Sequence, residues 1–199
     1  FRSEKARSVN MPADNIKRAI DRATGAGDGT VYEELVYEGY GPGGIAVLVE
    51  TQTDNKNRTA ADVRSYFTKM GGQLAGAGAV AWQFEARGLV TVAGARDADA
   101  VALAAIDAGA EDVDTSDPAR IEVYTNPGDL RAVREALESA GYPVESAESA
   151  MIAKNTVELD SSKARQALRL VEMLEDHDDV QRVTANFDIP EDVLAELAG

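Results

Sequence analysis

The chain has 199 residues, of which 44% are hydrophobic and 28% charged, a composition typical of globular proteins and not of disordered or collagen-like chains. Because 20 Lys and Arg stand against 35 Asp and Glu, the net charge of −15 confines any nucleic-acid contact to local patches. The absence of cysteine and the single histidine exclude disulfides, thiol nucleophiles and Cys- or His-rich metal sites. No apolar run approaches the roughly 18–20 residues that span a bilayer, so we expect a cytoplasmic protein without membrane contact.

The first 27 residues are expected to be helical and basic. Ile16, Ala19, Ile20 and Ala23 follow the i, i+3, i+4, i+7 spacing of one buried helical face, and Pro12 stands near the helix start. Six basic residues against three acidic ones make the stretch a candidate nucleic-acid contact. The basic residues are Arg2, Lys5, Arg7, Lys17, Arg18 and Arg22. We interpret residues 1–27 as a basic helical segment.

The period of the pattern changes after residue 31. Alternation predicts strands over 35–38 and 45–50, joined by a glycine-rich turn. That turn satisfies Gly-x-Gly-x-x-Gly, but a strand and not a helix follows it, so a hairpin is favoured over a dinucleotide site. A helix is expected to begin at a capping box of Thr59 and Asp62. A further strand is predicted over 79–85, with Trp82 and Phe84 on one face.

Residues 88–152 show the element order β-α-β-β-α-β, which is typical of a ferredoxin-like domain. A strand over 156–159, a helix burying Ala164 to Leu174 and a strand over 180–187 follow. Neither this unit nor 31–85 can bury both faces of a sheet alone, so we expect them to complete one sheet together. The fold class is therefore α+β. Its predicted domains are 1–27, a discontinuous core of 31–87 plus 153–187, an inserted ferredoxin-like domain over 88–152, and a C-terminal tail over 188–199.

Catalytic chemistry is disfavoured by what the sequence lacks. A serine triad would need His177 as its base, but His177 stands in an acidic stretch that is expected to be a solvated turn. The same acidic run lacks the alternating ligands and central glycine of a calcium loop. We expect no enzyme activity, no metal and no cofactor.

The stretch 55–69 carries four basic side chains and one acidic one, in contrast to 97–148, where three basic residues stand against thirteen acidic ones. Cations beside the exposed amides of a helix start could bind phosphate, although an ordinary solvated helix face has the same pattern. The candidate nucleic-acid-binding residues here are Asn55, Lys56, Asn57, Arg58, Arg64 and Lys69. Tyr32, Tyr37 and Tyr40 could stack bases, but packing beside the hairpin is the favoured interpretation.

Four segments, taken in order, resemble the YebC/PmpR family, which includes the mitochondrial translational activator of cytochrome c oxidase subunit I. They are Asn10–Ile20, Tyr37–Gly44, Thr53–Thr59 and Val80–Phe84. The resemblance implies a helical N-terminal domain and two α/β-sandwich domains, one of them ferredoxin-like and inserted in the other. It also implies that residues 1–27 are the C-terminal part of that helical N-terminal domain, whose basic start is missing. It also implies one of two roles, since members are described as DNA-binding transcriptional regulators or as ribosome-associated factors that relieve stalling at proline-rich stretches.

Residues and resemblance together predict a non-enzymatic, nucleic-acid-binding regulator of gene expression that binds DNA. The alternative is a ribosome-associated translation factor that contacts rRNA. In either case we expect a monomer that meets DNA, rRNA or the ribosome through local basic patches.

Overall fold

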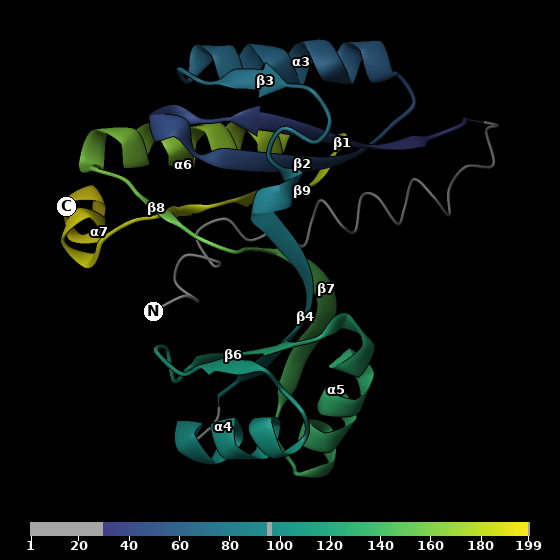
Figure 1. Ribbon diagram of the computed structural model, residues 1–199, viewed down its shortest axis with the longest axis vertical. Helices are drawn as coiled ribbons and strands as arrows, with labels where there is room; N and C mark the ends of the chain where they lie inside the picture. The colour runs from purple at the N-terminus through teal and green to yellow at the C-terminus, as the bar shows by residue number, and fades with distance from the viewer. Residues whose placement is uncertain (1–29, 95–96, 199) are drawn as a thin grey trace. The chain divides into compact units, whose positions relative to one another are not determined.

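A computed structural model describes residues 30–94 and 97–198, and these residues form two compact units (Figure 1). Unit 1 comprises residues 85–152, and unit 2 comprises 30–84 together with 153–198. The helical segment predicted over 1–27 lies outside the described residues. Among the residues that are described, every helix falls short of the length and hydropathy that a bilayer span requires.

Unit 2 is built on a four-stranded sheet in the order β3-β1-β2-β9. The strands are β1 (Glu33–Tyr40), β2 (Ala46–Thr53), β3 (Gln73–Ala75) and β9 (Val180–Ala185). The predicted hairpin is confirmed, because β1 and β2 pair antiparallel from Glu33↔Thr53 to Tyr40↔Ala46. Its turn, η1 (Pro42–Gly44), needs glycine at 43 and 44, where φ is 75° and 80°. Since β9 pairs with β2, residues from both ends of the described chain share one sheet.

Two helices, α3 (Lys56–Lys69) and α6 (Ser161–Asp176), pack against one core with this sheet. The residues fully buried in that core include Val47, Val63, Phe67 and Leu170. Apolar residues recur about every 3.6 positions on α3 and α6 and every second position on β2, so each element turns one apolar face to the core. A short parallel pair, β8 (Val157–Glu158) with β10 (Phe187–Asp188), and the helix α7 (Glu191–Ala198) complete the unit.

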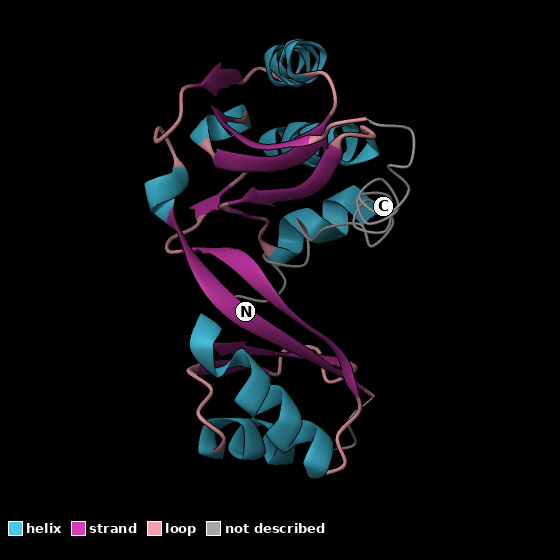
Figure 2. Cartoon of the chain, turned by 90° about the vertical axis from the view of Figure 1, so that its right-hand side faces the viewer, coloured by secondary structure: helices cyan, strands magenta, loops and turns pink. Residues whose placement is uncertain are grey.

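Unit 1 shows the predicted β-α-β-β-α-β order, with sheet order β5-β6-β4-β7. Its strands are β4 (Phe84–Ala93), β5 (Asp112–Asp114), β6 (Arg120–Thr125) and β7 (Val144–Ala153); its helices are α4 (Ala98–Asp107), η3 (Pro127–Asp129) and α5 (Leu130–Ser139). Val101 of α4 and Leu137 of α5 are fully buried against Ile121 and Val123 of β6. Figure 2 shows the helices and strands that make the described residues an α+β fold.

Three local predictions were wrong. The strand predicted over 79–85 is present only from Phe84, where β4 begins: a 3-10 turn, η2 (Ala81–Gln83), precedes it, and Trp82 is 67% exposed while Phe84 is buried. The helix α3 begins three residues before Thr59, because Asn55 caps it. The stretch 188–199, expected to be a tail, contains the last residue of β10 and the helix α7, and it places Ile189 and Val193 in the core of unit 2.

Candidate functional site

The start of α3 is fixed by short-range polar contacts. The side-chain oxygen of Asn55 accepts the amide of Arg58 at 3.1 Å, which is the contact of an N-cap residue. The hydroxyl of Thr53 in turn accepts the amide of Asn55 at 2.9 Å. Asn55, predicted to bind nucleic acid, therefore has its side-chain carbonyl committed to the helix start.

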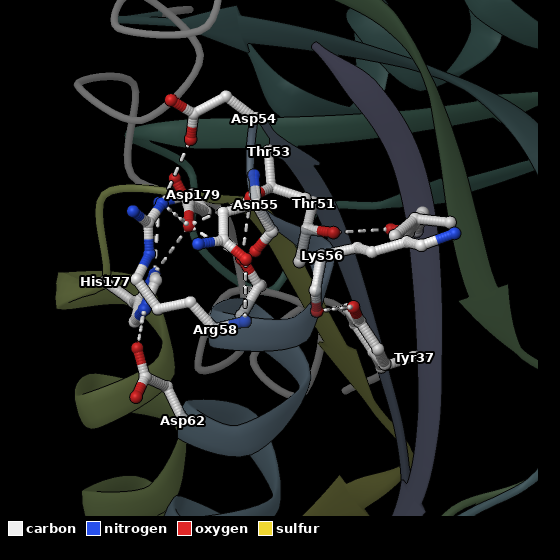
Figure 3. Close-up of polar contacts among 12 residues, drawn as sticks. Tyr37, Thr51, Thr53, Asp54, Asn55, Lys56, Arg58, Asp62, His177 and Asp179 are labelled. Atoms are coloured by element: carbon white, nitrogen blue, oxygen red, sulfur yellow. Dashed lines mark hydrogen bonds and ion pairs between the residues drawn. The ribbon is translucent and has the colours of Figure 1, made fainter.

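A buried carboxylate lies beside this helix start (Figure 3). Asp179 is only 3% exposed, and its Oδ2 accepts the hydroxyl of Thr59 at 2.7 Å, the hydroxyl of Thr53 at 3.3 Å and the guanidinium of Arg58 at 3.1 Å. Burial alone would raise the pKa of Asp179, but the hydrogen bonds from Thr59 and Arg58 outweigh it and lower the pKa. The carboxylate thus stays ionised and joins α3 to the turn before β9.

Arg58 is held by two carboxylates. Its Nη2 lies 3.1 Å from Asp54 and 3.1 Å from Asp179, and the hydrogen bond to Asp179 is the largest cause that raises the pKa of the guanidinium. A phosphate at this position would compete with both partners for the same donors. Phosphate binding by Arg58 stays a prediction, and its observed contacts are those of a structural ion pair.

The sequence suggested that His177 lies in a solvated turn, and this prediction was wrong. The His177 side chain is 11% exposed, Nδ1 lies 3.1 Å from the amide of Asp179, and Nε2 lies 2.9 Å from Oδ2 of Asp62. Because a backbone amide can only donate, Nδ1 is the acceptor, and Nε2 carries the proton and donates to Asp62. The ring of Tyr66 meets the imidazole edge to face at 6.1 Å between centroids. His177 therefore joins the end of α6 to α3.

These groups line a cleft of about 540 Å³. Its walls are Tyr32, Asp54, Arg58, Asp62, Tyr66 and Asp176 to Asp179. Five aspartates outnumber one arginine and one histidine in this lining, so the cleft carries more acidic than basic side chains. Within residues 30–94 and 97–198, no group of three or more acidic or histidine side chains is arranged to hold a metal ion.

Three of the predicted cations on α3 are placed differently from Arg58. Lys56, Arg64 and Lys69 are exposed, and none of them has an ion-pair partner among the described residues. Asn57 is exposed as well. The predicted contacts Arg2, Lys5, Arg7, Lys17, Arg18 and Arg22 lie outside the described residues.

The sequence interpretation missed a second set of cations, on α6. Lys163 and Arg165 are exposed in the first half of this helix, and Arg169 pairs with Glu172 at 3.3 Å. The signal was present, because residues 161–171 contain three basic side chains and no acidic one. The sequence interpretation used the apolar pattern of α6, which predicts the buried face of the helix and says nothing about the cations on its exposed face.

The helices α3 and α6 contact each other and run in opposite directions (Figure 1). His177, just after α6, meets Asp62 in the first half of α3, while Lys163 at the start of α6 lies beside the hairpin turn at Gly43. The second half of α3 therefore lies next to the first half of α6. We call this region the cationic end and define it by Arg64, Lys69, Lys163 and Arg165; the acidic cleft lies at the other end of the same two helices.

Known proteins share this fold and sequence. The family described as "TACO1/YebC second and third domain" matches residues 32–187. A "Probable transcriptional regulatory protein" of Rubrobacter xylanophilus is 54% identical over 198 residues, covering 98% of this chain and 79% of the relative. One of Roseiflexus castenholzii is 53% identical over 199 residues, covering 98% of this chain and 78% of the relative.

A solved structure also matches this chain in fold and sequence. The crystal structure of the conserved hypothetical protein Aq1575 from Aquifex aeolicus matches with a TM-score of 0.78 and 42% identity, over 90% of this chain and 74% of that one. The matched residues 32–187 take in both units of the described fold. The chain belongs to the TACO1/YebC family.

Proposed function

We propose that this protein is a non-enzymatic regulator of gene expression that binds nucleic acid through the cationic end of α3 and α6. The observation that carries the proposal is the set of exposed cations without ion-pair partners among the described residues, held on two packed helices of a protein whose net charge is −15. Phosphate contacts dominate nucleic-acid affinity, and a local cluster of Lys and Arg can supply them despite a net charge of −15. Relatives named probable transcriptional regulatory proteins support the regulatory role.

DNA is the first candidate ligand. Binding of a labelled DNA duplex is measured by fluorescence anisotropy at salt concentrations between 50 and 200 mM. The triple variant Arg64→Ala, Lys69→Ala, Arg165→Ala is expected to weaken binding and to lower the slope of log K against log salt by about 1 for each phosphate that is no longer neutralised. Arg131→Ala is the matched control, because this arginine is 83% exposed but lies on α5 of unit 1. Equal salt slopes for the wild-type protein and the triple variant would show that the cationic end does not bind phosphate.

A ribosome-associated role in translation is the second candidate. It is favoured by charge layout, because residues 97–148 of unit 1 carry three basic and thirteen acidic side chains while unit 2 carries the cationic end. Separate patches of opposite sign suit a partner made of rRNA and basic proteins. Sedimentation with ribosomes in a sucrose gradient, together with ribosome pauses in a deletion strain, supports this role. A reproducible promoter footprint without ribosome association supports DNA instead.

The proposal also includes that the protein is monomeric, lies in the cytoplasm and needs no cofactor. The acidic cleft is consistent with the absence of catalysis, because its only histidine uses both ring nitrogens in structural hydrogen bonds.

A further inference from the structure

The only tryptophan of the chain lies at the surface. Trp82 is 67% exposed, and Tyr40 is 39% exposed. Tryptophan is highly buried on average, so a tryptophan with two thirds of its surface in water is an unusual feature of a folded domain. Large aromatic side chains that stay exposed are typical of sites that bind a partner.

The loop that carries Trp82 is held in place by a buried carboxylate. Glu38 is 6% exposed, and it accepts the amides of Gly78 at 2.6 Å, Val80 at 3.0 Å and Ala81 at 2.7 Å. Burial would raise the pKa of Glu38, but these three hydrogen bonds lower it overall, so the carboxylate is ionised when it binds the loop. Three charge-assisted contacts within four residues fix the backbone of the loop.

The polar edges of both aromatic rings are turned to the same atom of this loop. The indole Nε1 of Trp82 donates to the carbonyl oxygen of Ala79 at 3.0 Å, and the hydroxyl of Tyr40 donates to it at 3.4 Å. The exposed surface that remains to Trp82 is therefore hydrocarbon, since the only hydrogen-bond donor of the indole is occupied. A ligand here is recognised by stacking on the ring.

The charge around Trp82 favours an anionic ligand. The amide of Lys154 donates to the carbonyl of Gln83 at 2.9 Å, which places this exposed lysine next to η2. Gln83 also meets a neutral amide, because Asn186 donates to its side chain at 3.0 Å, and the carboxylate of Glu85, two residues further on, is paired with Arg87 at 2.8 Å. The nearby carboxylate of Glu38 is enclosed by backbone amides and does not face outward.

From these contacts we propose that Trp82 and Tyr40 form a stacking platform for unpaired nucleobases of a single-stranded nucleic acid, with Lys154 supplying positive charge for the phosphate. The inference rests on the proposed function, since it names the form of nucleic acid that this protein binds. A flat aromatic ligand linked to phosphate matches a hydrocarbon ring face beside a cation. A duplex does not match it, because its base faces are covered by neighbouring pairs.

The single tryptophan makes the platform directly observable, because all tryptophan fluorescence of this chain comes from Trp82. Titration of the full chain with a ten-nucleotide oligothymidylate is expected to quench this fluorescence to saturation, while a duplex of the same length leaves it nearly unchanged. Trp82→Ala is expected to weaken single-strand binding, measured by anisotropy of the labelled oligonucleotide, by about 5- to 150-fold, the range for loss of one stacked base. Trp82→Phe keeps an aromatic face and restores most of the affinity.

The possible failures are distinguishable. If the oligonucleotide binds with a salt slope that depends on Arg64 and Lys69, but Trp82→Ala binds as tightly as the wild type, the platform is refuted and the proposed function stands. If a ten-residue polyproline peptide quenches Trp82 and the oligonucleotide does not, the ring face binds peptide and the inference is wrong. If the wild type binds neither single strand nor duplex, both proposals fail together.

Discussion

Removal of the Asp179 carboxylate tests the contact that joins α3 to the turn before β9. In Asp179→Ala, the hydroxyls of Thr59 and Thr53 lose their charged acceptor. A hydrogen bond to a charged group contributes about 1.5–3 kcal/mol, and the bond from Thr53 is long at 3.3 Å, so we expect a loss of about 3 kcal/mol in the free energy of unfolding. For a urea m-value of about 2 kcal/mol/M, the midpoint falls by about 1.5 M.

The assay is urea denaturation followed by far-UV circular dichroism at several pH values. Because the folded-state pKa of Asp179 is lowered, its contribution is fully present above the unfolded-state pKa and disappears as the pH falls through the folded-state value. The difference in the free energy of unfolding between the wild type and Asp179→Ala is therefore constant near neutral pH, and it becomes smaller below about pH 4.

Asp54→Ala is the matched control, since Asp54 also binds Arg58 but its side chain is 42% exposed. Solvent screens that ion pair, so the control is expected to change the midpoint little. A midpoint for Asp179→Ala no lower than that of Asp54→Ala, or a difference that persists unchanged at low pH, would refute the assignment of the stabilisation to a buried, ionised carboxylate.

Two further substitutions test the packing of each unit by urea denaturation. In unit 2, Gly72→Ala is expected to destabilise by at least about 2 kcal/mol, because a Cβ would overlap the carbonyl oxygen of Tyr40, whereas Gly76→Ala has open space and is expected to be near neutral; equal effects of the two would contradict this packing. In unit 1, Leu137→Ala is expected to cost about 2–5 kcal/mol because Leu137 is fully buried, while Leu103→Ala, 65% exposed, is expected to have little effect; a larger effect of Leu103→Ala would show that the exposed face of α4 is the one that is packed.

The elements that the sequence predicted well are those with long, regular patterns. The hairpin of β1 and β2 and the β-α-β-β-α-β order of unit 1 follow from period changes and turn residues, which are local properties. The strand predicted over 79–85 was wrong for residues 79–83, because the alternation of apolar residues there does not correspond to a strand. The backbone there is held by Glu38, about forty residues earlier, and no local pattern reveals such a contact.

The candidate site was harder to predict for the same reason. The sequence marked Arg58 as a cation, but its partner Asp179 is separated from it by 121 residues. The isolated pattern of α3 shows its cations and cannot show which of them is paired across the fold. Lys163 and Arg165 were visible as cations on α6, and only the packing of α6 against α3 brings them to the same end as Arg64 and Lys69.

The interrupted course of unit 2 sets the order in which it can fold during synthesis. The chain leaves this unit at Phe84 and returns at Ala153, and Thr53 of β2 is separated by 126 residues from Asp179, the residue before β9. At a synthesis rate of about 5–20 residues per second, β2 emerges roughly 6–25 s before β9, which pairs with one of its edges. All strands of unit 1 are complete before β9 is made. Until then one edge of β2, whose first four residues are apolar and buried in the folded unit, is open to pairing with other chains, so the nascent protein needs protection at this edge.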